Sequence, residues 1–220
     1  EADMAHLLAA ELGVGLEFVL LERDDIRRHL SSGRIDIMMA GFLVTPERAV
    51  DVHFTAPYLN STLGLVVPDH ERGHFDTNKK LKEIESMTIA AVNLPYYSKF
   101  VERNLPNLKV VPIDSPKEFF LAAPGEFDAL LLSAEVASAW TLVYPSYTVV
   151  VPKPRTVTAP IALGLPRNAP KLSDFVESWL LLQHESGALK ILQRYWIQGE
   201  GAKSKEPRWS IMRDVLGWAD

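Results

Sequence analysis

The sequence predicts an α/β protein built from two similar strand and helix units. Helical and strand patterns alternate along the first 44 residues, and a second series of strands and helices runs from residue 87 to residue 133. A polar stretch at 66–80, expected to be a loop, separates the two series. Alternation on this scale calls for right-handed crossovers and a mostly parallel sheet, whose ligands bind beyond the carboxyl ends of the strands.

The first unit alternates helix and strand twice. Its helices show apolar residues at helical spacing, and its strands are short continuous apolar runs. The predicted elements are a helix over 4–12, a strand over 16–21, a helix over 24–30 and a strand over 35–44. Asp3 is a candidate N-cap of the first helix, and Gly13 is expected to end it. Residues 40–48 therefore lie at the carboxyl end of a strand, where a ligand site is expected.

The second unit repeats the same alternation. Its predicted elements are a strand over 87–92, a helix over 96–104, a strand over 108–113, a helix over 116–123 and a strand over 127–133. An extended segment interrupted by prolines follows at 154–166, and two amphipathic helices are predicted over 172–182 and 187–195. A further helix with one apolar face is predicted over 207–220.

Composition excludes several classes of protein. The chain of 220 residues is 47% hydrophobic and 23% charged, which is ordinary for a soluble globular protein. Its net charge is -5 and its basic residues are dispersed, so nucleic acid is not expected as a partner. Cysteine is absent, which excludes a disulfide framework and a thiolate metal site. The longest apolar runs fall far short of the roughly 20 residues that a membrane helix needs.

Residues 33–58, GRIDIMMAGFLVTPERAVDVHFTAPY, resemble the signature of the polar-amino-acid type of bacterial extracellular solute-binding protein. The positions that match it are Gly33, Asp36, Thr45, Arg48, Phe54, Thr55, Pro57 and Tyr58. Segments at 126–137 and 159–196 are similar to later parts of the family, so the resemblance covers about residues 3–196.

The resemblance implies a periplasmic-binding-protein-like fold of type II. Such a fold has two α/β lobes joined by two crossing strands, which close over a ligand by hinge motion. Lobe one would comprise 1–67 plus 160–220, and lobe two 68–159, with hinges near 66–68 and 158–161. The family's opening strand has no counterpart in this sequence. We predict that another segment or a partner molecule fills the gap, or that lobe one is weakened, because a missing strand leaves its neighbours unpaired.

The same resemblance implies a domain that captures solutes and is not an enzyme. Its partners would be a small anionic or zwitterionic ligand and a membrane transporter component, separate or fused. The domain would be periplasmic or extracytoplasmic, either free or tethered to the inner membrane by parts of a longer protein. The arginine that matches Arg48 clamps the ligand carboxylate in the family, and a planar, permanently charged guanidinium suits that role. A surface ion pair with Glu47 or Asp51 is the alternative.

Departures from the family pattern bear on the ligand. Ser133 stands where an amine-binding aspartate is expected, Leu43 replaces a hydroxyl residue, and Leu94-Pro95 replace a Gly-Thr pair that donates hydrogen bonds. A neutral hydroxyl cannot pair with an ammonium as a carboxylate does, although Glu135 is a candidate substitute. These departures favour an organic anion, such as a dicarboxylate, over a standard α-amino acid.

The predicted ligand-binding residues come from both lobes. They are Arg48, Thr45, Gly41, Phe42, Arg23, Tyr58, Asn93, Tyr96, Tyr97, Ser133 and Glu135. For Arg23 the alternative is a solvated charged face, and for Tyr96 and Tyr97 it is the core.

Three alternatives remain open at the level of sequence. A few relatives of the fold are dehydratases of cyclic carboxylic acids, for which Glu135 could serve as the acid. A sensor domain of a membrane receptor would use the same closure. The helix at 207–220 either packs on lobe one or, as in solute-binding domains fused to sodium/dicarboxylate symporter-like proteins, leads toward a transporter.

No metal or cofactor is expected. HERGH at 70–74 matches the spacing of a zinc protease motif, but that motif needs a stable helix, and Gly73 lies inside it. No phosphate loop, nucleophile elbow or dinucleotide glycine pattern occurs in the sequence.

Overall fold

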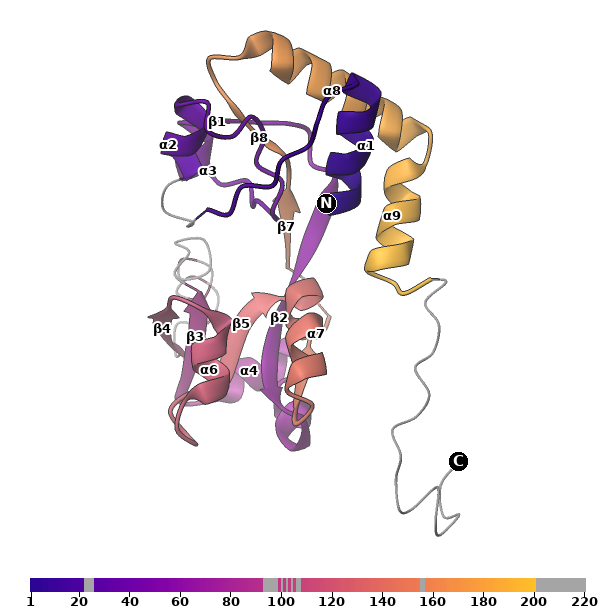
Figure 1. Cartoon of the computed structure of the whole chain (residues 1–220). Helices are drawn as coiled ribbons and strands as arrows, with labels where there is room; N and C mark the ends of the chain where they lie inside the picture. Colours follow the sequence, from indigo (N-terminus) through magenta and orange to yellow (C-terminus); the bar gives the residue numbers. More distant parts are fainter. Residues whose placement is uncertain are drawn as a thin grey trace. The chain divides into compact units, whose positions relative to one another are not determined.

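Two sheets organise the part of the chain that the structure describes (Figure 1). The computed structural model describes residues 1–21, 26–92, 99, 101, 103, 105, 108–154 and 157–200. The chain divides into the units Glu1–Leu182 and Gln183–Asp220, and both sheets belong to the first. We call the part built on the two-stranded sheet lobe one and the part built on the six-stranded sheet lobe two. The predicted lobe boundaries themselves stay a prediction.

Lobe two is built on a mixed sheet with the strand order β4-β3-β5-β2-β6. Its strands are β2 (Leu59–Pro68), β3 (Met87–Val92), β4 (Leu108–Ile113), β5 (Ala129–Ser133) and β6 (Tyr147–Val150). β3 pairs parallel with β4 and β5, whereas β2 pairs antiparallel with β5 and β6. The predicted strands at 87–92, 108–113 and 127–133 are therefore confirmed, because each is a buried apolar run flanked by turn residues.

The helices of lobe two are η2 (Asp69–His74), α4 (Asn78–Glu83), α6 (Pro116–Leu121) and α7 (Ala134–Val143). The prediction of a loop over 66–80 was wrong: β2 ends there, and η2 and the start of α4 follow. Thr77 caps α4 by accepting a hydrogen bond from the backbone N–H of Lys80, a local signal within a polar stretch. The predicted helix over 116–123 is confirmed in α6.

Lobe one contains α1 (Ala2–Leu12), α2 (Ile26–Ser31), α3 (Pro46–Ala49) and the antiparallel pair β1 (Val52–Phe54) and β8 (Gly164–Pro166). The helix predicted over 4–12 is confirmed, and Gly13 ends it in the left-handed conformation at φ 67°. Asp3 lies in its first turn and Glu1 at the cap position.

The strands predicted at 16–21 and 35–44 were wrong. Residues 16–21 form no strand, and 35–44 contributes only isolated bridges, at Met38 to Gly164 and at Leu43 to Ile161. Within the described ranges, no segment pairs with 16–21 as a strand. Val19 and Leu21 still pack on a core cluster, but Phe18 is 62% exposed and Leu20 97% exposed. An apolar run becomes a strand only when a neighbouring strand accepts its backbone hydrogen bonds.

Two strands connect the lobes. β2 pairs antiparallel over Leu59–Thr62 with β7 (Thr158–Ile161), which lies within the extended segment predicted at 154–166. Figure 1 shows β2 continuing from this pairing into the six-stranded sheet. Two crossing strands are what a two-lobed binding fold requires.

α8 (Pro170–Glu185) confirms the helix predicted over 172–182. Trp179 on α8 donates its indole N–H to the carboxylate of Glu11 on α1, with 2.7 Å between Nε1 and Oε2, so the two helices are tied together. α9 (Ala188–Trp196), in the second unit, confirms the helix predicted over 187–195. The predicted helix over 207–220 lies outside the described residues. None of the helices described combines the length and hydropathy needed to cross a bilayer.

Candidate functional site

The segment Thr45-Pro46-Glu47-Arg48 forms the start of a short helix. Thr45 has an extended backbone at φ -134° and caps α3, because its hydroxyl oxygen accepts a hydrogen bond from the backbone N–H of Arg48 at 3.4 Å. Pro46 occupies the first helical turn, where a missing N–H is tolerated. The spacing of Thr45 and Arg48 in the sequence is therefore that of an N-cap and its third helical residue. The cap fixes the position from which the arginine side chain projects.

The side chain of Arg48 is half-buried, and contacts with Leu43 and Phe42 help to orient it. Its Nη1 donates to the backbone oxygen of Leu43 at 3.0 Å, and its guanidinium carbon lies 4.4 Å from the centre of the Phe42 ring. A cation over an aromatic face is stabilised by the ring quadrupole, and Phe42 itself is buried in the core of lobe one. These contacts orient the guanidinium of Arg48.

The two carboxylates proposed as alternative partners of Arg48 have other cations. Asp51 accepts from Arg27 Nη1 at 3.1 Å, and Glu47 accepts from Lys99 Nζ at 2.5 Å. Lys99, which follows β3, was not predicted as a site residue. No local signal in the sequence relates it to Glu47, because the two residues are 52 positions apart.

Gly41 and Tyr58 meet at the carboxylate of Glu1. The backbone N–H of Gly41 donates to both carboxylate oxygens at 2.8 Å, and the Tyr58 hydroxyl donates to Oε1. Gly41 adopts a positive φ of 59°, which few side chains tolerate, so the glycine is required for this approach. Burial, with the neighbouring Glu1 carboxylate, raises the pKa of Tyr58. Both predicted ligand residues thus hold the first turn of α1 in this structure.

The Phe-Thr-Ala-Pro-Tyr part of the motif has a structural role. The backbone N–H of Thr55 donates to the Leu163 carbonyl at 3.1 Å, and the Thr55 hydroxyl oxygen accepts from the Leu163 N–H at 3.2 Å. Phe54 lies 5.3 Å from Phe42, ring centre to ring centre. This part of the motif supports the aromatic ring on which Arg48 lies.

In lobe two, Ser133 and Glu135 begin α7 at the carboxyl end of β5. Ser133 caps the helix by accepting from the backbone N–H of Val136 at 3.3 Å. Glu135 is turned toward β2: its Oε2 accepts from the hydroxyl of Ser61 at 2.8 Å, and its Oε1 accepts from the backbone N–H of Thr62 at 3.0 Å. The carboxylate expected near the ligand is therefore bonded to a connecting strand.

The structure groups the predicted site residues into three sets. Phe42, Thr45 and Arg48 form one contact group in lobe one, and Gly41 and Tyr58 are joined through Glu1. Ser133 and Glu135 lie on the first turn of α7. The remaining predicted residues, Arg23, Asn93, Tyr96 and Tyr97, lie outside the described residues.

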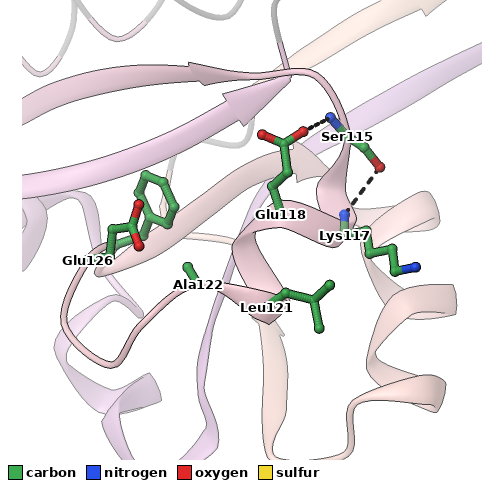
Figure 2. Close-up of a pocket in the computed structure, with 7 residues that line it drawn as sticks. Ser115, Lys117, Glu118, Leu121, Ala122 and Glu126 are labelled. Atoms are coloured by element: carbon green, nitrogen blue, oxygen red, sulfur yellow. Dashed lines mark hydrogen bonds between the residues drawn. The ribbon is translucent and has the colours of Figure 1, made fainter.

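A surface pocket lies along α6 and contains none of the predicted ligand residues. Figure 2 shows Glu118 and Ser115 at one end of it and Glu126 at the other. Glu118 accepts from the backbone N–H groups of Asp114 and Ser115, at 3.0 Å and 2.8 Å, and the Ser115 hydroxyl accepts from the Lys117 N–H. These contacts form a capping box, so the polar groups at this end of the pocket cap the N-terminus of α6.

HERGH does not form the helix that a zinc protease needs. It lies in η2, a 3-10 helix with three residues per turn, so His70 and His74 do not share a face as they would on an α-helix. His70 lies 3.5 Å from Glu71 instead. Among the residues the structure describes, no cluster of three or more histidine or acidic side chains could hold a metal ion.

Comparisons with known proteins agree with this architecture. The model of the bacterial extracellular solute-binding proteins, family 3, matches residues 1–199. Cyclohexadienyl dehydratase of Pseudomonas aeruginosa is 27% identical over 201 residues, which cover 90% of this chain and 74% of the relative. ABC transporter arginine-binding protein 1 of Escherichia coli is 24% identical over 165 residues, covering 74% of this chain and 64% of the relative.

Solved structures show the same fold. An ancestral amino acid-binding protein, a precursor of cyclohexadienyl dehydratase, superimposes with a TM-score of 0.74 at 25% identity, covering 89% of this chain and 84% of that chain. A substrate-binding protein of Streptococcus pneumoniae bound to L-arginine superimposes with a TM-score of 0.76 at 20% identity, covering 92% and 84%. The fold is periplasmic-binding-protein-like.

Proposed function

Because the chain belongs to the bacterial extracellular solute-binding proteins of family 3, we propose that it captures a small carboxylate-bearing solute between its two lobes. The captured solute is then passed to a membrane transporter component, separate or fused, on the extracytoplasmic side. The observation that carries this proposal is the orientation of Arg48 by the Phe42 ring and the Leu43 carbonyl. Orienting a charged fork in advance reduces the entropy lost when it binds a carboxylate.

The proposed site combines the arginine with hydroxyl donors. Thr45 and Ser133 each use the hydroxyl oxygen as an acceptor for a helix N–H, and the O–H of such a group can point toward a ligand oxygen. In the proposed site Arg48 binds the carboxylate, with Thr45 beside it and Ser133 facing it from lobe two. Arg23, Asn93, Tyr96 and Tyr97 complete the proposed set.

Two ligand classes fit this proposal. Relatives are named for amino acids, arginine among them, which supports an amino acid. A neutral Ser133 at the end of β5 supports an organic anion, because a hydroxyl pairs weakly with an ammonium. We rank the organic anion first.

A thermal-shift panel tests the proposal. The wild type, Arg48→Ala and the control Arg27→Ala are heated with amino acids, dicarboxylates, keto acids and aromatic acids. Arg27 forms an exposed ion pair with Asp51 in lobe one, so its loss tests for general effects of removing an arginine. A ligand at about one hundred times its Kd stabilises the native state by roughly 2.7 kcal/mol. We expect one ligand class to stabilise the wild type and Arg27→Ala but not Arg48→Ala. Equal stabilisation of all three proteins contradicts the role of Arg48.

The resemblance to the Pseudomonas aeruginosa dehydratase favours a second candidate, dehydration of a cyclohexadienyl carboxylic acid with Glu135 as the proton donor. For that role Glu135 would first have to leave its hydrogen bonds with Ser61 and Thr62. Incubation of the wild type and Glu135→Gln with such an acid, followed by its ultraviolet absorbance, tests this candidate. Turnover by the wild type that is abolished in Glu135→Gln supports it, and no turnover by the wild type rejects it.

A further inference from the structure

The strand β2 changes its partners at one point. Over Leu59–Thr62 it pairs with β7, and from Leu65 onward it pairs with both β5 and β6 of lobe two. Leu63 belongs to both parts, because its N–H donates to the Val157 carbonyl at 2.8 Å while the residue pairs with Ser133 of β5. The junction between the two pairings therefore lies at Leu63. Backbone rotation at such a junction changes the direction of one part of the strand relative to the other, which is how a hinge works.

Glu135 holds β2 at this junction. Its carboxylate accepts from the Ser61 hydroxyl at 2.8 Å and from the Thr62 N–H at 3.0 Å and 3.2 Å. Ser61 lies 74 positions before Glu135 in the sequence. Ser61 is only 3% exposed, so its hydroxyl depends on a protein partner. The three hydrogen bonds tie the first turn of α7 to the residues on one side of the junction.

Close packing keeps α7 against β2. A Cβ atom placed on Gly64 would lie 3.4 Å from the Cβ of Ala134 and 3.2 Å from Cγ1 of Val149. β2 therefore passes directly beneath the residue that precedes Glu135. Ser133 fixes the start of the same turn through its cap to Val136. This packing fixes the backbone from which the Glu135 side chain reaches β2.

We propose that Glu135 is a positioning residue of the hinge. By fixing Ser61 and Thr62, it sets the direction in which β2 leaves lobe two, and so the balance between open and closed arrangements of the lobes. The effect on ligand affinity rests on the proposed function, since affinity depends on closure. Glu135 would change affinity without touching the ligand.

The side chain's hydrogen bonds and its charge can be separated by substitution. Glu135→Gln keeps an oxygen that accepts from Thr62 and an amide that can donate to the Ser61 oxygen, but it removes the charge. Glu135→Ala removes both functions, and Glu135→Asp keeps the charge but withdraws the oxygens by one methylene. A ligand contact or a catalytic acid would depend on the carboxyl group itself, whereas the hinge contact depends on hydrogen bonds at the right distance.

The control is Asp128, which holds a strand start within lobe two. Its Oδ2 accepts from the Thr88 N–H at 2.7 Å. Both residues are remote in sequence from the junction in β2. Asp128→Ala thus removes a carboxylate that binds backbone, as Glu135→Ala does, without touching β2. Denaturant unfolding compares the free energy of unfolding lost in Asp128→Ala with that lost in Glu135→Ala.

The distance between the lobes is the deciding measurement. The chain contains no cysteine, so Val50→Cys in lobe one and Leu121→Cys in lobe two, both exposed, can carry spin labels whose separation is measured by electron resonance. We expect Glu135→Ala and Glu135→Asp to broaden or shift the distance distribution. Glu135→Gln and Asp128→Ala should keep the wild-type distribution. If Glu135→Ala does not fold, the distance distribution of Glu135→Asp alone tests the proposal.

A wild-type distribution in both Glu135→Ala and Glu135→Asp overturns the proposal. A shift in Glu135→Gln as large as that in Glu135→Asp also overturns it, because charge rather than hydrogen bonding would then be responsible. The measurement needs no ligand, so it stands even if the thermal-shift panel finds none. Where a ligand is found, its Kd should change in Glu135→Asp and stay within about twofold of wild type in Glu135→Gln, a difference below 1 kcal/mol.

Discussion

Lys99 Nζ lies 2.5 Å from the carboxylate of Glu47, and this ion pair joins the two lobes. Glu47 lies on α3 between Thr45 and Arg48, and Lys99 follows β3 of lobe two. A hydrogen bond from Lys99 lowers the pKa of Glu47. The pair therefore connects lobe two to the helix that carries the proposed ligand clamp, although β2 and β7 are the strands that cross between the lobes.

Loss of this ion pair should favour the open arrangement. We expect Glu47→Gln and Lys99→Met each to lengthen the mean distance between labels at positions 50 and 121, and to weaken ligand binding slightly. Exposed pairs are screened by salt, so the difference from wild type should shrink as ionic strength rises. Asp51→Asn, which removes the exposed pair with Arg27 within lobe one, should leave the distance unchanged. An equal change in Asp51→Asn would show that the effect is not specific to the pair between the lobes.

Acid should release the same contact. Because the folded pKa of Glu47 is lowered from its ordinary value of 4.5, the pair contributes fully above pH 4.5 and is lost as the pH falls through the lower folded value. The distance between the labelled lobes should then increase on acidification in the wild type. In Glu47→Gln the acid-dependent part of that increase should be absent, and a full increase in that variant would contradict the assignment.

Tyr58 should resist ionisation in alkali. Burial and the Glu1 carboxylate raise its pKa above the ordinary value of 10.0, so the native state keeps the phenol protonated while the unfolded chain loses the proton. Stability should therefore fall as the pH rises above 10.0, and this fall should be smaller in Tyr58→Phe. Tyrosinate absorbance of the folded protein should be the same in both proteins until the wild type unfolds. A larger absorbance change in the folded wild type would show that Tyr58 is accessible to base.

Gly164→Ala should destabilise lobe one. A Cβ atom at this position would lie 3.0 Å from Cδ1 of Phe42 and 3.1 Å from Cγ1 of Val52, both buried. Overpacking of this kind costs about 1–3 kcal/mol, and it would also displace the ring on which Arg48 lies. Gly73→Ala is the control, because a Cβ there meets nothing within 4 Å. Denaturant unfolding should show a lower free energy of unfolding for Gly164→Ala and little change for Gly73→Ala. If both variants unfold with the same free energy as the wild type, lobe one relaxes around the added methyl group.

Local signals were enough to predict much of the fold. The helix α1 ends at Gly13 because glycine accepts a left-handed backbone. The start of α3 was not predicted, although Thr45-Pro46 offers a local signal for it, since a hydroxyl cap and a proline both suit a first turn. The strands β3 and β4 are apolar runs between turn residues. The family was likewise identified from residues 33–58, since the motif lies within one short stretch of chain.

Features that depend on distant partners were missed or misread. The apolar run at 16–21 has the composition of a strand, but no described segment supplies the neighbour that pairing requires. The sequence predicted Glu135 as a ligand contact, which stays a prediction, but it gave no sign that the carboxylate bonds to Ser61 and Thr62, because Ser61 lies 74 positions earlier in the chain.

The sequence by itself therefore determined the α/β class, the end of α1 at Gly13 and the family, because each depends on residues close together along the chain. Tertiary structure alone decided which apolar runs pair as strands, that Glu1 holds Gly41 and Tyr58, and that Glu47 reaches Lys99. These contacts form only when remote segments are folded together, and no periodicity or spacing along the chain encodes which carboxylate will meet which donor.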